Sequence, residues 1–468
     1  MEILVLMAIP TAIVWSVVAA KYGMQLLPEG GSGRYVLPLR PLPTAMTIAM
    51  LCGIVFGYEF FHYSLGPAPL TLDRVLFAGI ILAYGIQYLR HAEDLLPLSI
   101  VDGMMLAWFF LIAISVFTHD FRYQQNAPLA RLIFFYGMPL SVYWVMRHVK
   151  LSLSDLRLIL LAFAGLAIYL ALMGIAEVKG WHGVVFPRQI LEPGEFFGRA
   201  RGPLQNPVIN GILMVLGGCC MWTFWPKVYL RGRIAIVMLT TILAAGVFAT
   251  LTRSVWLGLI AAGAVMIWYP ASRRQKGIMM VCAMVLFTMA LPFVGENLFS
   301  FKRDTNVSQA DMEQSAKLRP LFATVAWRMF QDRPLVGCGY GQYAREKTPY
   351  LLDPASNRPL RMTAGYVQHN VFLAYLVEMG IAGLGILLVV MGLIIRESWR
   401  LWRQPDLDWL VRLFGLLMIS LLINYAINGM FHDVSIIPVA NLLMFFFFGI
   451  VVNLRTATVC YHELLSKC

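Results

Sequence analysis

The sequence predicts an all-α polytopic membrane protein with about 12–13 transmembrane helices and a large extracytoplasmic loop. Hydrophobic residues make up 59% of the 468 residues, charged residues make up only 13%, and the mean hydropathy is +0.70. Soluble proteins carry about 25% charged residues. Apolar runs recur along the whole chain, many near the ~20 residues that cross a bilayer. They do not show the alternation over about 10 residues that is typical of barrel strands.

About 13 apolar segments account for this helix count, with boundaries set by polar loops. They begin near residues 3, 44, 74, 100, 132, 157, 208, 234, 254, 277, 368, 411 and 436. The first has an acid, Glu2, before its apolar core and Lys21 after it. A secretory signal peptide has the opposite polarity, so we expect a retained first span.

Alternate loops carry the basic residues and so predict the orientation of the chain. The basic loops are "KYGMQLLPEGGSGRYVLPLR", "RHAED", "RHVKLSLSDLR", "KVYLRGR", "SRRQKG" and "RESWRLWRQ". The positive-inside rule places them in the cytoplasm together with the carboxyl terminus. The net charge of +12 is spread over these short loops. This distribution sets topology and attracts anionic membrane lipids, so we expect no nucleic-acid partner.

The opposite side of the membrane then receives the long segment 295–367. Loops longer than about 12–15 residues are usually functional or disordered. Within it, "QSAKLRPLFATVAWRMFQDRPLVGCGYGQY" has apolar residues at helical spacing, which predicts an amphipathic helix followed by a glycine-rich turn. "GCGYG" at 337–341 lacks the lysine and serine or threonine of a phosphate loop and follows no strand, so we interpret it as a turn. If that turn is exposed, Cys338 will react with membrane-impermeant thiol reagents.

Several cations are expected on this outer side. Taken alone, each of them could have a structural role without taking part in function. Arg253 would be a snorkelling arginine at a helix end, and Arg319 a solvated surface charge. Arg199 and Arg201 would be interface anchors, and His369 a capping histidine at the start of an apolar helix. Charged residues near membrane depth nevertheless tend to mark functional sites.

Their combination on one face indicates an anionic, lipid-linked substrate. Arginine holds phosphate oxygens bidentately without losing its charge. A diphosphate leaving group gains negative charge as its bond breaks, so fixed cations stabilise the transition state. A neutral imidazole at His369 could take the proton of an attacking hydroxyl.

No metal or cofactor is expected from the residue pattern. The seven cysteines form no CxxC pair and predict neither a disulfide framework nor a zinc site. The acidic pair in "DLD" at 406–408 lies in a short cytoplasmic loop, where a helix start explains it. The acids of the outer loop are scattered and indicate no metal site: Asp304, Asp311, Glu313 and Asp353.

Four stretches together resemble the O-antigen ligase family of bacterial membrane proteins, which includes ligases and related polymerases. They are "GRARGPLQNPVINGI", "ATLTRSVWLG", "LRPLFATVAWRMFQDRPLVGCGYGQY" and "HNVFLAYLVEMGIAGLG". The last two are the most specific, because they combine an arginine, an amphipathic helix, Pro-Leu-x-Gly-x-Gly, His-Asn and Glu-x-Gly-x-x-Gly. The resemblance covers residues 195–395 as the catalytic region, between terminal groups of spans at 1–194 and 396–468.

The resemblance implies metal-independent, inverting glycan transfer from an undecaprenyl-diphosphate carrier to a hydroxyl acceptor. It implies a fold of the membrane glycosyltransferase (GT-C-like) type, located in the bacterial inner membrane with the catalytic face outside. By motif, Arg253 and Arg319 would bind the diphosphate, His369 would be the base, and Asn370 would join the binding site. Arg199 and Arg201 match less decisively, because either could occupy the motif position. The family commonly has serine where this chain has Thr252.

Two questions stay open at this level. A ligase and a polymerase use the same donor and differ in the acceptor, lipid A core or a growing polysaccharide. A lipid-linked oligosaccharide flippase, or another polysaccharide transporter, would need cations deep in the bundle and reached alternately from both sides. The candidate cations cluster at one face, which favours an enzyme.

Overall fold

The helical membrane class is confirmed by the computed structural model, which describes residues 42–58, 60–65, 68–90, 96–123, 127–277, 280, 309–351 and 359–466. In this part of the chain, eight helices are long and apolar enough to cross a membrane. A short antiparallel hairpin of β1 (Tyr63–Leu65) and β2 (Ala68–Leu70) is the exception to the helical architecture among these residues.

The apolar helices that the structure describes coincide with expected apolar segments, and further helices lie within the segment 295–367. In chain order they are α2 (Leu42–Val55), α3 (Leu72–Arg90), α4 (Ile100–Phe117), α5 (Pro128–Arg131), a π-helical turn (Leu132–Gly137), α6 (Met138–His148), α7 (Leu153–Val178), α8 (Pro207–Trp222), α9 (Leu230–Ala249), α10 (Arg253–Trp268), α12 (Gln309–Asp332), α13 (Tyr343–Glu346), α14 (Thr348–Leu351), α15 (Val371–Trp402), α16 (Trp409–Gly429) and α17 (Pro438–Ser466). The expected segment near residue 3 lies outside the described residues, as does nearly all of the segment near 277.

Side-chain caps fix where several of these helices begin. Ser152 accepts a hydrogen bond from the Asp155 amide at the start of α7, and Asn206 accepts from two amides at the start of α8. Asp408 caps α16 in the same way, which agrees with the helix-start role expected for "DLD". Each cap satisfies amides that have no partner within the helix.

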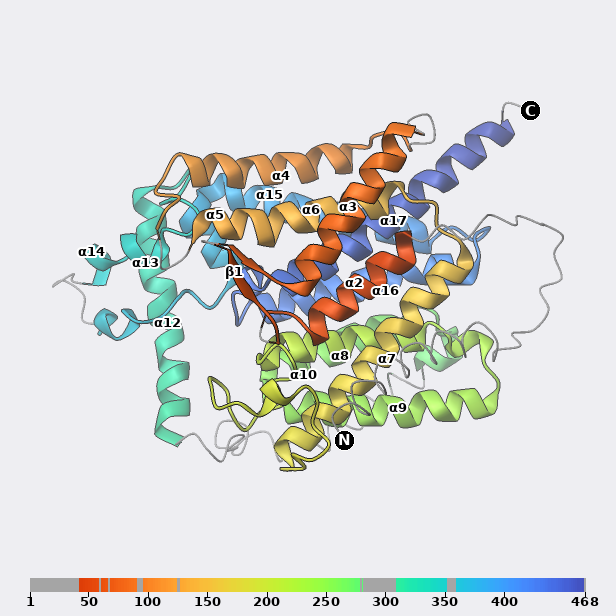
Figure 1. Cartoon of the computed structure of the whole chain (residues 1–468), viewed down its shortest axis with the longest axis horizontal. Helices are drawn as coiled ribbons and strands as arrows, with labels where there is room; N and C mark the ends of the chain where they lie inside the picture. Colours follow the sequence, from red (N-terminus) through yellow and green to blue (C-terminus); the bar gives the residue numbers. More distant parts are fainter. Residues whose placement is uncertain are drawn as a thin grey trace.

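The packing of α10 against α16 brings two distant parts of the chain to one end of the bundle. Gly258 of α10 faces Asn424 of α16, and Ser420 donates to the Ala262 carbonyl oxygen at 3.2 Å. The helices therefore run antiparallel, so Arg253 at the start of α10 lies at the end where α16 finishes. Near that end, α12, α13 and α14 lie together, and α12 runs across the direction of the long helices (Figure 1).

Helix α15 is broken at Gly380, where φ is +64°. The glycine-rich turn after α12 packs into this break and pairs with it through the main chain. The Cys338 and Gly339 amides donate to the carbonyls of Val377 and Glu378, both at 2.9 Å. In return, the Ile381 amide donates to the Pro334 carbonyl at 2.8 Å. The segment is therefore a turn, as expected, and its partner is a helix backbone.

Burial in this break changes what is expected of Cys338. Its side chain is 4% exposed, packed in the small core between α12 and α15. Burial also raises the pKa of the thiol, and the neighbouring Glu378 acts in the same direction. Reaction of Cys338 with membrane-impermeant thiol reagents was expected only if the turn is exposed. Because Cys338 is buried, this condition is not met.

We expect Gly337→Ala to destabilise the protein. Gly337 has φ +70°, and a Cβ there would collide with the backbone of Glu378 in α15. A left-handed alanine combined with overpacking costs about 2–4 kcal/mol. A lowered unfolding temperature of the purified protein would show this loss. The control is Gly392→Ala in α15, where an added Cβ would have no atom within 4 Å. This variant should not lower the unfolding temperature. Equal stability of the two variants would mean that the turn is not held in the break.

Candidate functional site

The structure brings Arg253, Arg319 and His369 together from three separate segments. Arg253 begins α10, Arg319 belongs to α12, and His369 precedes α15. Burial lowers the pKa of Arg319, and the positive charge of Arg253 lowers it further. Burial likewise lowers the pKa of His369, with Arg319 as the second cause. Arg319 thus lies within electrostatic reach of both Arg253 and His369.

Arg319 is positioned by an aromatic ring from the opposite side of the site. Its guanidinium carbon lies 5.1 Å from the ring centre of Phe431, in the turn that follows α16. This cation–π contact fixes the arginine over the end of the α10–α16 pair without neutralising its charge. Arg253 and Arg319 both remain exposed, so their charges are accessible to a ligand.

His369 is half-buried and has an unusual backbone conformation. Its φ is +51°, in the left-handed region that histidine adopts more readily than most residues. Its ring packs against Phe322 of α12 and Tyr366, with centroid distances of 5.5 and 6.3 Å. Burial and the nearby positive charge lower its pKa from an ordinary value near 6.5, which favours the neutral imidazole at pH 7.

Two further residues hold the segment that carries His369. Asn370 caps α15 by accepting from the Leu373 amide, and its side-chain nitrogen donates to the Met430 carbonyl at 2.9 Å. The buried ammonium of Lys347 donates to the carbonyls of Tyr366 and Thr363, at 2.6 and 3.2 Å. Asn370 therefore has a visible positioning role beside the binding role expected of it.

The structure separates Arg199 from Arg201. Arg201 is fully buried and pairs with Glu177 of α7 at 3.0 Å. Its guanidinium also donates to the carbonyls of Ile190 and Glu192 at 2.6 and 2.9 Å. These bonds give Arg201 a structural role that leaves little capacity for a substrate. Arg199 is half-buried, with its guanidinium carbon 5.4 Å from the Phe196 ring.

Phe431 and Lys347 are the positioning residues that sequence reasoning missed. Phe431 belongs to the short turn around His432 and Asp433, but a phenylalanine there gives no signal of a partner 112 positions earlier. Lys347 resembles any loop lysine, and only its burial shows its role.

Asp433 lies in the same turn as Phe431. Burial raises the pKa of its carboxyl group. Hydrogen bonds from Ser435 and the charge of Arg131 oppose that rise.

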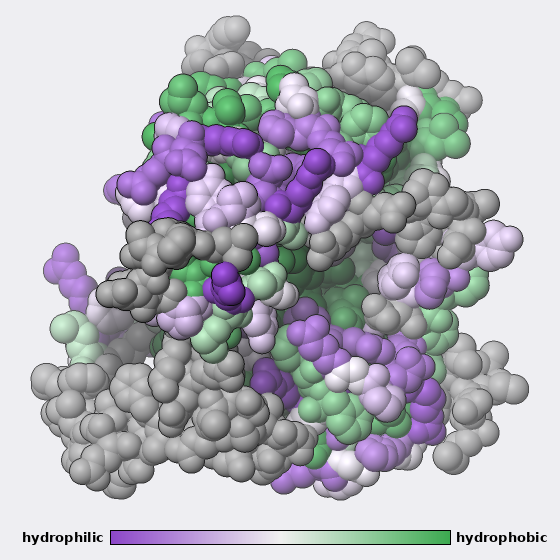
Figure 2. Space-filling view, turned by 90° about the vertical axis from the view of Figure 1, so that its left-hand side faces the viewer, coloured by the Kyte–Doolittle hydropathy of each residue, from purple (hydrophilic) through white to green (hydrophobic). Residues whose placement is uncertain are grey.

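Over the described residues, no three histidine, cysteine or acidic side chains converge as metal ligands would. Figure 2 shows the end of the molecule that carries α12, where hydrophilic residues gather around a recess near the middle.

Replacing Arg201 by glutamine should destabilise the protein by about 3–5 kcal/mol, because the carboxylate of Glu177 would stay buried without its partner. Thermal unfolding of purified variants measures this effect. Arg199→Gln is the matched control, two positions away, and should cost less because the side chain of Arg199 is only half-buried. Similar losses in both variants would contradict the structural role of Arg201.

Comparison with known protein families agrees with this geometry. Residues 236–388 match the family model described as O-Antigen ligase. The matched segment runs from α9 into α15 and includes Arg253, Arg319, His369 and the turn in the α15 break, but not Arg199 or Arg201. No curated protein matches the chain. The resemblance seen in the sequence is confirmed over this segment: in this multi-pass membrane protein, residues 236–388 are similar to the O-antigen ligase family.

Proposed function

We propose that the protein transfers a glycan from an undecaprenyl-diphosphate carrier to a hydroxyl acceptor at the outer face of the bacterial inner membrane. The acceptor is lipid A core for a ligase or a growing polysaccharide for a polymerase. The O-antigen ligase domain indicates glycan transfer of this type. The single observation that carries the proposal is the meeting of two exposed arginines with a half-buried histidine whose pKa is lowered.

Arg253 and Arg319 are suited to bind the diphosphate. Each guanidinium raises the electrostatic energy of the other, which is why Arg253 lowers the pKa of Arg319. An anion placed between them removes this repulsion and gains two attractive interactions. Because charge on the diphosphate increases as the glycosidic bond breaks, the pair stabilises the transition state more than the bound donor.

His369 supplies the base in this mechanism. The acceptor hydroxyl gives its proton to the imidazole, and its oxygen forms a new bond to the anomeric carbon of the donor. The bond from that carbon to the diphosphate breaks, and the diphosphate leaves with the electron pair. Attack from the face opposite the leaving group inverts the configuration. The two arginines provide the charge that a metal ion supplies in other transferases, so the reaction needs no metal.

The position of the site favours an enzyme over a flippase. Helix α10 has 16 residues and is therefore about 24 Å long, with Arg253 at its first position. Arg319 and His369 lie at the same end. A flippase would need its substrate site near the middle of the bundle, reached from both sides in turn.

Substitutions should separate base catalysis from donor binding. His369→Ala should lower the chemical rate about 10²- to 10⁴-fold and leave carrier binding largely intact. Arg253→Ala and Arg319→Ala should weaken both binding and turnover, and Arg319→Lys should not restore them fully, because an ammonium lacks the bidentate fork. Donor consumption and carrier binding are measured on purified variants, with and without EDTA. Arg345→Ala, which removes an exposed arginine paired with Asp120, is the control.

Wild-type turnover by His369→Ala would show that the histidine only precedes a helix. Complete loss of transfer in EDTA, restored by magnesium or manganese, would show that the reaction requires a metal.

The pH dependence of kcat/KM should report the lowered pKa of His369 in the free enzyme. Activity requires the neutral imidazole, so it should fall as pH decreases, with the midpoint below 6.5. Arg319→Gln removes a neighbouring positive charge and should move this midpoint to higher pH, while Arg345→Gln should not move it. If the midpoint is unchanged in Arg319→Gln, the group that titrates in the activity profile is not His369.

The orientation is tested with Thr348→Cys, in the exposed part of α14, in a variant whose native cysteines are replaced by alanine. A membrane-impermeant thiol reagent should label it in intact spheroplasts. Arg274→Cys, an exposed position in the basic loop after α10, should react only after the membrane is permeabilised. The reverse result would place the arginines and His369 in the cytoplasm and remove the mechanism.

A further inference from the structure

A second cavity lies at the opposite end of the bundle from Arg253, Arg319 and His369. Helix α10 begins at Arg253 and ends at Trp268, and α16 begins at Trp409 and ends beside Phe431. The cavity is formed where α8 and α10 finish and α16 starts, about 24 Å from the arginines by helix length. The arginines and His369 therefore take no part in it.

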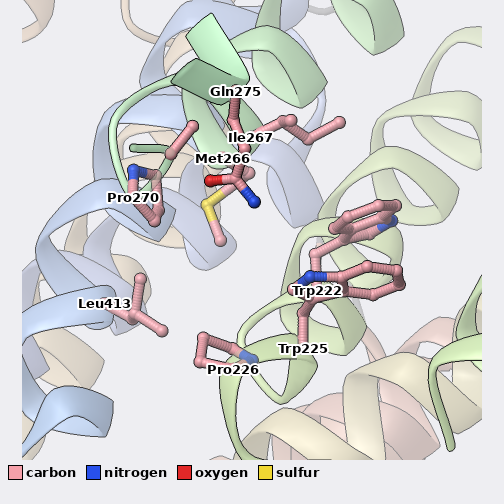
Figure 3. A pocket seen from close by; sticks show the side chains of 9 residues that line it. Trp222, Trp225, Pro226, Met266, Ile267, Pro270, Gln275 and Leu413 are labelled. Carbon is pink, nitrogen blue, oxygen red and sulfur yellow. The ribbon is translucent and has the colours of Figure 1, made fainter. Parts of the chain in front are cut away.

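This cavity is an apolar groove of about 400 Å³. Trp222 and Trp225 form one wall, with their rings stacked at a centroid distance of 4.8 Å. Across the gap lie Met266, Pro270 and Leu413 (Figure 3). The volume is in the range of sites that hold small apolar ligands. Trp225 stays half-exposed and Ile267 is exposed, so the groove opens at the protein surface.

Positive charges border the groove on several sides. Arg233 places its guanidinium carbon 5.5 Å from the ring of Trp225, one of the lining residues. Lys276 follows the lining residue Gln275, and its ammonium nitrogen lies 5.6 Å from the centre of the Trp268 ring. Lys227 follows Pro226, which also lines the groove. Within the described residues, none of these three cations makes a salt bridge. Asp408, just before α16, accepts a hydrogen bond from the Leu410 amide and caps that helix.

Tryptophan with basic residues at helix ends is typical of the interface between membrane and water. There, lysine and arginine attract the phosphates of anionic lipids, and basic pockets between helices bind anionic head groups. An apolar groove with a cationic border matches both parts of such a lipid. We propose that this groove binds an anionic phospholipid, with one acyl chain between Trp225 and Leu413 and the phosphate beside Arg233, Lys227 and Lys276.

The experiment uses the full-length protein, purified in detergent and stripped of lipid. Binding of phosphatidylglycerol and of phosphatidylcholine with the same acyl chains is measured by native mass spectrometry. Phosphatidylglycerol should bind more tightly. Arg233→Gln should weaken its binding about fivefold, as expected for one basic residue near an anionic lipid surface. Arg231→Gln removes an equal charge two positions away on α9, where the side chain points in another direction, and should have little effect.

A third variant tests the groove without changing any charge. Ala271→Leu adds volume to the lining and should reduce phosphatidylglycerol binding, although the cations remain. Equal binding of the two lipids, or equal loss in Arg231→Gln and Arg233→Gln, would overturn the proposal. Competition by glycerol phosphate as strong as that by the intact lipid would also overturn it, because the groove would then hold no acyl chain. These outcomes do not depend on glycan transfer.

Discussion

The break in α15 is the constraint on which the end of the protein that carries α12 depends. Main-chain groups exposed by a broken helix need partners wherever water is scarce. The turn at 334–341 supplies them through paired amides and carbonyls, and the Glu378 carboxylate accepts from the Gly341 amide at 2.9 Å. Glycines are needed because the two backbones approach more closely than a Cβ would allow. This pairing fixes α12, which ends just before the turn, against α15.

The cluster of charges follows from that arrangement. With α12 held against α15, Arg319 meets His369 on one side and Phe431 on the other. Packing of α10 on α16 then brings Arg253 to the same place. Two like charges next to each other raise the energy of the unliganded protein, and backbone contacts elsewhere offset that cost. Strain of this kind is common where a protein is organised for a ligand and for the charge that develops on it.

The sequence was sufficient for the helical class, for most helix positions and for the nature of the glycine-rich turn, because hydropathy and glycine patterns are local. The candidate residues Arg253, Arg319 and His369 were identified from their motifs, and the structure shows that they meet. Two features depended on tertiary contacts. Arg199 and Arg201 have the same local context, and burial of Arg201 against the carboxylate of Glu177 distinguishes them. Cys338 lies in a polar stretch, yet packing against α15 buries it.

The part of α15 beyond Gly380 runs to Trp402 and comprises about 22 residues, or ~33 Å, enough to cross the hydrocarbon core unaided. If that part spans the core, the nine residues before the break, which start beside His369, would stand at the level of the lipid head groups. A carrier would present its diphosphate at that same depth while its isoprenoid tail stayed among the surrounding lipids. On this arrangement and the proposed function, the protein would recognise the polar end of the donor, and carriers with shorter tails would serve as substrates provided that they remain in the membrane.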